Sequence, residues 1–122
     1  MFNPFNSPQP AAARLSMADA IEQVARGDMA LIDVRDISEV RISGKAKDAL
    51  HIPLMLLNSK ADPRSPECES SLDTAKPVGL YCATGARSHM AAQMLSKMGY
   101  QAVFNLGGLY DWASAGGQVE PI

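Results

Sequence analysis

The sequence predicts an α/β domain in which a parallel sheet carries helices on both faces. Two short apolar runs, at residues 29–34 and 78–81, have the continuous hydrophobic character of strands buried on both sides, and a third strand is expected at residues 102–106. Segments with apolar residues at helical spacing lie between and around these runs. Strand and helix therefore alternate along the chain, which is typical of a parallel sheet.

Composition and charge are those of one ordinary globular domain. The chain has 122 residues, of which 47% are hydrophobic and 20% charged, enough to bury a core without covalent staples. The net charge of −2 gives no overall field that would attract nucleic acid or an anionic membrane, so neither partner is expected. Two cysteines are too few for a disulfide framework or a structural zinc site.

The chain shows no targeting or membrane signal. No segment approaches the ~20 apolar residues of a membrane span, and the N-terminal stretch lacks the basic start and apolar run of a secretory signal. We therefore expect a cytoplasmic, reducing environment, in which a lone thiol stays free to react.

The first half of the chain is predicted to contain a lead-in, a helix and a strand. Residues 1–13 hold three prolines and are expected to form a flexible lead-in to a single domain over residues 14–122. A helix should begin after Ser16, whose hydroxyl can cap it, and end at Gly27. The strand at 29–34 follows, and then a polar segment with a short helix near residues 38–42.

The second half repeats the alternation. The apolar run at 51–57 contains Pro53, which keeps it from being a long central strand. Residues 58–77 are expected to form the longest loop, with a short helix near 69–75. After the strand at 78–81, we expect a helix over 88–98, a strand over 102–106, a turn at 107–108 and a short final helix.

A cysteine, Cys82, stands where the strand at 78–81 should meet the next helix. In open parallel sheets, ligands bind beyond the carboxyl ends of the strands. The first N–H groups of a helix lack partners, and the helix dipole is positive at that end. A loop that curls from Cys82 into the helix can therefore aim backbone N–H groups at the sulfur or at an anion bound there.

The loop after Cys82 combines small side chains, two hydroxyls and one cation. Gly85 permits a positive φ, and Arg87 adds a permanent positive charge. The two alanines leave the backbone accessible, and the hydroxyls can bond a bound group or cap the helix. Such surroundings would lower the pKa of the thiol below about 8.5 and make it a nucleophile. The loop residues are Ala83, Thr84, Gly85, Ala86, Arg87 and Ser88.

A cysteine at the end of a buried strand has a simpler interpretation, that of an inert, small apolar residue. The glycine, the arginine and the predicted start of a helix after Cys82 favour the functional interpretation.

Four motifs resemble the rhodanese-like domain family. The stretch "CATGARS" at 82–88 resembles the family's active-site loop, Cys-x-x-Gly-x-Arg-Ser. Segments 31–39, 43–54 and 99–120 resemble three further family motifs in the same order, so the resemblance covers nearly the whole chain after residue 13. Two positions depart from the family, which often has Gly at Asp48 and Ile at Ala46.

The resemblance implies a five-stranded parallel sheet and sulfurtransferase activity. Cys82 would take a sulfane sulfur from thiosulfate or from a partner protein's persulfide, and would pass it to cyanide or a thiol. The loop residues would hold the outer sulfur, and Arg87 would attract an anionic donor. Neither a metal nor an organic cofactor is needed, because the cysteine itself carries the transferred group.

Two other functions stay open at this point. Some rhodanese-like domains lack the cysteine and serve as regulatory binding modules. Cysteine phosphatases and arsenate reductases also place a cysteine before a ring of amides and an arginine. In those enzymes five residues separate the cysteine from the arginine. Here only four residues separate Cys82 from Arg87.

Three further polar residues have both a functional and a structural interpretation. Asp33 and Arg35 follow the first strand and could support the catalytic loop or form a structural ion pair, for example Arg35 with Glu39. Cys68 could resolve a persulfide or form a disulfide with Cys82, but its place in a polar, acidic segment favours a bystander thiol.

Overall fold

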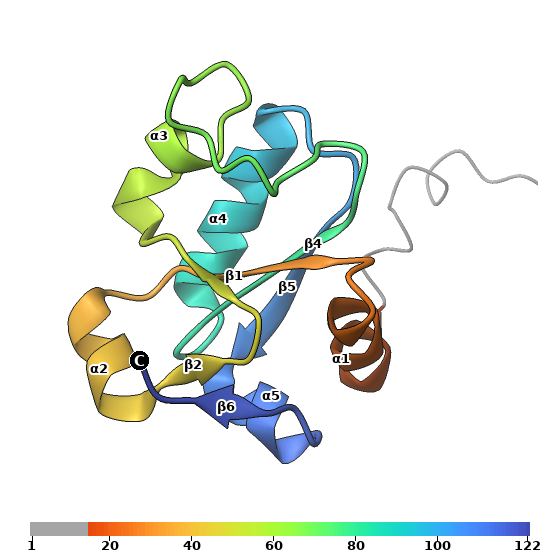
Figure 1. Cartoon of the computed structure of the whole chain (residues 1–122), viewed down its shortest axis with the longest axis vertical. Coiled ribbons are helices and arrows are strands. Elements are labelled where there is room, and N and C mark those ends of the chain that lie inside the picture. Colours follow the sequence, from red (N-terminus) through yellow and green to blue (C-terminus); the bar gives the residue numbers. More distant parts are fainter. Residues whose placement is uncertain (1–14) are drawn as a thin grey trace, which may run out of the picture.

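The computed structural model describes residues 15–122 and contains a four-stranded parallel sheet (Figure 1). Neighbouring strands pair in the order β3-β1-β4-β5, and every pair is parallel. The predicted lead-in over residues 1–13 lies outside the described residues. The strands are β3 (Leu50–His51), β1 (Ala30–Asp33), β4 (Val78–Cys82) and β5 (Val103–Gly108).

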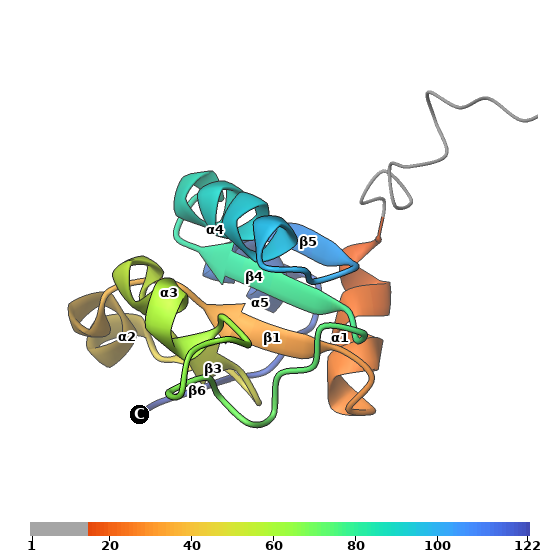
Figure 2. The same ribbon diagram turned by 90° about the horizontal axis from the view of Figure 1, so that it is seen from above.

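Helices cover both faces of this sheet, as the alternating pattern predicts. In Figure 2, α3 and α4 lie on one face, and α1 and α5 lie on the other. No helix within residues 15–122 combines the length and the apolar character that crossing a membrane requires. The helices are α1 (Met17–Ala25), α2 (Ile37–Ser43), the 3-10 turn η2 (Leu54–Leu56), α3 (Leu57–Lys60), α4 (Ala86–Lys97) and α5 (Leu109–Ser114).

The main sheet has four strands within the described residues, one fewer than the family resemblance implies. The edge strand β3 stops after two residues, and Pro53 caps the 3-10 turn η2 that follows, although the Ile52 N–H still donates to the Asp33 carbonyl at 3.0 Å. The preceding segment, β2 (Lys45–Ala46), pairs antiparallel with β6 (Val119–Glu120) in a separate two-stranded sheet. The C-terminal segment is thereby joined to the stretch before β3 (Figure 1).

The predicted start of the first helix is confirmed, because it depends on residues that are close in the chain. The Ser16 hydroxyl accepts a hydrogen bond from the Asp19 N–H at 3.0 Å, and α1 begins at the next residue. Two predictions were wrong. Residues 69–75 form turns rather than a helix, and Gly107 and Gly108 belong to β5 rather than to a turn.

Side chains of the central strands alternate between two hydrophobic clusters. Ile32, Leu80 and Cys82 face the cluster that α4 completes with Leu95. Leu31 and Tyr81 face the opposite cluster, with α1 and α5. Cys82 therefore lies on the α4 side of the sheet, directly below the start of that helix.

The backbone at Asp48 suits the glycine that the family resemblance leads us to expect at this position. Its φ is +70°, a left-handed conformation that most side chains disfavour and that Asp tolerates better than most. The residue is exposed, so its backbone conformation, and not its packing, limits which side chains the position accepts.

We expect Asp48→Ile to lower the free energy of unfolding by about 1 kcal/mol, because a β-branched side chain is strained at this φ. Asp48→Gly should stay within about 0.5 kcal/mol of the wild type, because relief of strain is offset by the greater freedom of glycine in the unfolded chain. Equilibrium unfolding in urea measures both. An Ile variant as stable as the Gly variant would contradict the assigned backbone conformation.

Candidate active site

The structure places a hydrogen-bond donor directly against the sulfur of Cys82. Cys82 is the last residue of β4, and α4 begins four residues later at Ala86. Between them the chain turns back, and the Gly85 N–H donates to Sγ at 3.0 Å. Gly85 has a φ of +102°, so the turn uses the conformational freedom that only glycine has without strain.

Two opposing effects set the ionisation of this thiol. Burial raises the pKa of Cys82, but hydrogen bonds from the Ser88 hydroxyl and from the backbone N–H groups of Ser88, Gly85 and Thr84 favour the thiolate. The net result is a pKa lowered to about 7. An ordinary thiol has a pKa of about 8.5, so Cys82 is more acidic although it is buried.

The predicted loop residues divide into an outer and an inner group. Ala83, Thr84 and Ala86 are exposed, whereas Ser88 is buried and its Oγ lies 3.4 Å from the Cys82 sulfur. Cys82 itself is 0% exposed. The loop around Cys82 is therefore open to solvent, whereas the cysteine itself is covered.

Arg87 is bound to a carboxylate on α2 in this structure. Its two terminal nitrogens donate to the two carboxylate oxygens of Glu39 on α2, at 2.6 and 2.9 Å. Glu39 also accepts the Asp36 N–H at 3.0 Å, which caps α2. The hydrogen bond from Arg87 is the largest cause that lowers the pKa of Glu39 to about 2. The loop is thus tied to α2 by an ion pair that persists at neutral pH.

Asp33 and Arg35 form a buried ion pair with each other, with Arg35 Nη2 and Asp33 Oδ2 2.7 Å apart. The suggested partner of Arg35, Glu39, was wrong, because Glu39 binds Arg87. The Tyr81 hydroxyl donates to the same Asp33 oxygen at 2.6 Å. Tyr81 directly precedes Cys82, so this pair fixes the end of β4 from beneath the loop.

The same cluster reaches two more segments. Arg35 donates to the Gly44 carbonyl at 2.6 Å and to the Ser43 hydroxyl at 2.7 Å, both at the end of α2. The Ala46 N–H donates to the Tyr81 hydroxyl at 2.9 Å. Because every polar group in this cluster has a partner, its cost of burial is offset.

Sequence reasoning missed Asn105. Its side chain accepts from the Ser88 hydroxyl at 2.7 Å and donates to the Gly85 carbonyl at 2.9 Å. An exposed asparagine within a strand carries no motif, and only the pairing of β4 with β5 brings it to the loop.

The second cysteine, Cys68, lies far from Cys82. Cys68 sits beside Tyr100, beyond the end of α4, whereas Cys82 lies at the start of that helix. A helix of 12 residues is about 18 Å long, which is too far for a disulfide without rearrangement. Burial and the charges of Asp62 and Glu69 raise the pKa of Cys68, which supports its interpretation as a bystander.

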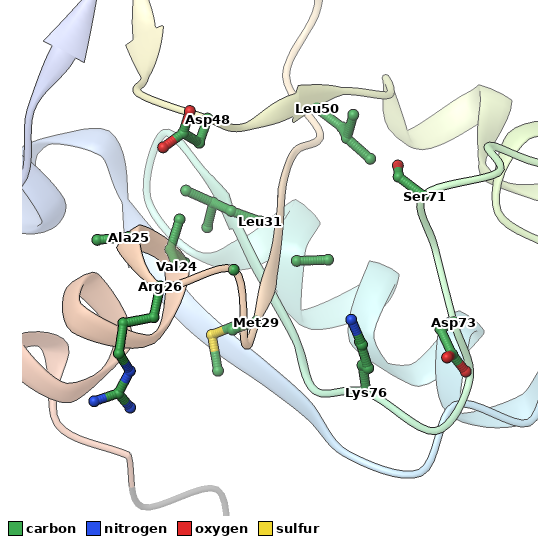
Figure 3. A pocket seen from close by; sticks show the side chains of 12 residues that line it. Val24, Ala25, Arg26, Met29, Leu31, Asp48, Leu50, Ser71, Asp73 and Lys76 are labelled. Atoms are coloured by element: carbon green, nitrogen blue, oxygen red, sulfur yellow. The ribbon is translucent and has the colours of Figure 1, made fainter.

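A hollow of about 450 Å³ lies at the opposite edge of the sheet from Cys82 (Figure 3). Its lining includes Met29 and Ala30 at the start of β1, and Ala30 is paired with the first residue of β4. Cys82 is the last residue of that strand, about 13 Å further along. The hollow therefore takes no part in chemistry at the sulfur.

Fold and site together define an α/β domain with a thiolate-stabilising loop at the carboxyl edge of its sheet. The model of the rhodanese-like domain family matches residues 16–115. The chain belongs to this family.

Relatives and solved structures agree with this assignment. A sulfurtransferase from Allochromatium vinosum is 36% identical over 90 residues, which cover 73% of this chain and 76% of the relative. The thiosulfate sulfurtransferase GlpE of Coxiella burnetii is 32% identical over 100 residues, covering 81% of this chain and 85% of the relative.

A solved structure from Rhodopseudomonas palustris, described as a protein of unknown function and possible tyrosine phosphatase, superposes with a TM-score of 0.71. It is 31% identical in sequence, and the match covers 93% of this chain and 90% of that one.

The Glu39–Arg87 pair should stabilise the protein in a pH-dependent way. We expect Glu39→Gln to lower the free energy of unfolding at pH 7 by at most about 1 kcal/mol, because both side chains are about one-third exposed and solvent screens them. Gln retains an oxygen that can accept the Asp36 N–H, so the change isolates the charge.

The difference between wild type and Glu39→Gln should shrink as the pH falls. The pKa of Glu39 is lowered on folding, so its contribution is fully present above the unfolded pKa of about 4.3 and is lost toward about 2. Urea unfolding from pH 7 to about 3 measures this. Glu22→Gln, in a more exposed pair with Arg26, is the matched control and should change little. A Glu39 effect that does not vary with pH would contradict the electrostatic origin.

Proposed function

We propose that the protein is a sulfurtransferase in which Cys82 carries a sulfane sulfur as a persulfide. The observation that carries this proposal is the Gly85 N–H, 3.0 Å from a cysteine sulfur whose pKa is about 7. A thiolate held by amides is a nucleophile, and we expect the same amides to stabilise an anionic outer sulfur.

In the first half-reaction, the Cys82 thiolate attacks the outer sulfur of thiosulfate. A new S–S bond forms at Sγ, the sulfur–sulfur bond of thiosulfate breaks, and sulfite leaves with the electron pair. In the second half-reaction, cyanide or a thiolate attacks the outer sulfur, and Cys82 leaves as the thiolate. Charge and atoms balance in both steps, and no redox partner or metal is needed.

Two classes of donor fit this reaction. A small anion such as thiosulfate would be drawn by the positive end of α4, although Glu39 already neutralises Arg87. A cysteine persulfide on a partner protein would approach past Ala83, where a hollow of about 450 Å³ is lined by apolar residues of α5 and β6 together with Arg35 and Ser43. Either reaction needs a reduced Cys82, so we place it in a reducing compartment such as the cytoplasm.

Phosphate-ester hydrolysis is less well supported. A phosphatase needs its arginine free to bind the phosphate oxygens, and here both terminal nitrogens of Arg87 are bound to Glu39. The loop also has only four residues between Cys82 and Arg87. A purely regulatory role does not require a reactive thiol, so it does not account for the lowered pKa of Cys82.

Cys82→Ser should abolish sulfur transfer, because the hydroxyl that replaces the thiol cannot form a persulfide. Cys68→Ser is the matched control and should retain most activity. Thiocyanate formation from thiosulfate and cyanide measures turnover, and intact mass after incubation with thiosulfate should show one added sulfur that maps to Cys82. Phosphate-ester hydrolysis is assayed in parallel.

Turnover retained by Cys82→Ser, or sulfur added at Cys68 alone, would contradict the proposal. Hydrolysis of phosphate esters without sulfur transfer would favour the phosphatase function instead.

A further inference from the structure

Asn105 is the polar side chain that joins the two sources of hydrogen bonds to the sulfur. Its Oδ1 accepts from the Ser88 hydroxyl at 2.7 Å and from the Gly107 N–H at 3.0 Å. Its Nδ2 donates to the Gly85 carbonyl at 2.9 Å. Ser88 and Gly85 are also the residues whose Oγ and N–H lie 3.4 and 3.0 Å from Cys82 Sγ.

The backbone partners fix which way the Asn105 amide points. Gly107 offers an N–H and Gly85 offers a carbonyl, so the oxygen must face Gly107 and the nitrogen must face Gly85. A flipped amide would set donor against donor and acceptor against acceptor. The acceptor that Ser88 meets is therefore an oxygen.

The single hydrogen of the Ser88 hydroxyl links Asn105 to the state of the thiol. When Cys82 is a neutral thiol, its S–H can donate to Ser88 Oγ while Ser88 donates to Asn105. When Cys82 is a thiolate, its sulfur only accepts, so the Ser88 hydrogen must turn toward it. Asn105 Oδ1 then loses the Ser88 hydrogen but still accepts the Gly107 N–H, so this oxygen keeps one hydrogen-bond donor.

We infer that Asn105 is a positioning residue for the sulfur chemistry: through the Gly85 carbonyl it holds the Gly85 N–H against the sulfur of Cys82, and through Ser88 it holds the hydroxyl oxygen beside that sulfur. It touches neither the sulfur nor the transferred group, so it acts only through these two residues. The inference rests on the proposed function, since it takes Cys82 as the reacting group.

The test is the pH dependence of Cys82 alkylation by iodoacetamide in the Cys68→Ser background, which reports thiolate formation without requiring sulfur transfer. The wild-type loop should give a midpoint near pH 7. Asn105→Ala should raise the midpoint by about one pH unit, which leaves about fivefold less thiolate at pH 7. Asn58→Ala, at another exposed asparagine on α3, is the matched control and should not move it.

Two further variants separate positioning from a general loss of structure. Asn105→Asp keeps an oxygen for Ser88 and Gly107 but removes the donor to Gly85 and adds a negative charge, so it should raise the midpoint at least as far. In the Ser88→Ala background, the upward shift caused by Asn105→Ala should be at least as large, because Asn105 then no longer competes with the sulfur for the Ser88 hydrogen and only its hold on Gly85 is lost.

Other charged groups around Cys82 must be accounted for in this profile. Arg87 and Glu39 are paired with each other, as are Arg35 and Asp33, and Asp111 accepts the Gly108 N–H at the start of α5. The profile is repeated in His89→Gln to remove any contribution from the imidazole beside Ser88 in the sequence.

An unchanged midpoint in Asn105→Ala, with folding confirmed by circular dichroism, would overturn the inference. So would the loss of this shift in the Ser88→Ala background. Because alkylation does not depend on sulfur transfer, failure of the proposed function would appear separately, as normal profiles without persulfide formation.

Discussion

The structure depends on hydrogen bonds that converge on one buried sulfur where β4 gives way to α4. Burial alone would keep Cys82 protonated and inert, and it is the larger single effect on the thiol. The Gly85 N–H, the Ser88 hydroxyl and neighbouring amides together outweigh it. An anionic sulfur can therefore exist in a site from which bulk water is excluded, and such a site strengthens each of these interactions.

The rest of the fold holds these donors in place from three sides. Below the loop, the buried Asp33–Arg35 pair and Tyr81 fix the end of β4. On the α2 side, Glu39 holds Arg87 in the first turn of α4. On the β5 side, Asn105 is bonded to both Gly85 and Ser88. Loops are ordinarily the mobile parts of a domain, and these contacts make this one a preorganised site.

Local signals in the sequence predicted β1, β4 and β5, the Ser16 cap of α1 and the positive φ of Gly85, because each depends on residues close in the chain. Contacts between distant segments could not be predicted in this way. Glu39 and Arg87 are 48 residues apart, and the link between Asn105 and Ser88 exists only because β5 pairs with β4. For the same reason the antiparallel pairing of β2 with β6 was missed.

The most direct test of the central claim is the ultraviolet thiolate absorbance of the Cys68→Ser protein as a function of pH, with the Cys82→Ser, Cys68→Ser protein subtracted. The structure predicts a single titration with a midpoint near pH 7. A midpoint at or above the ordinary thiol value of about 8.5 would show that burial prevails over the loop donors, and that Cys82 is a packed side chain and not a nucleophile.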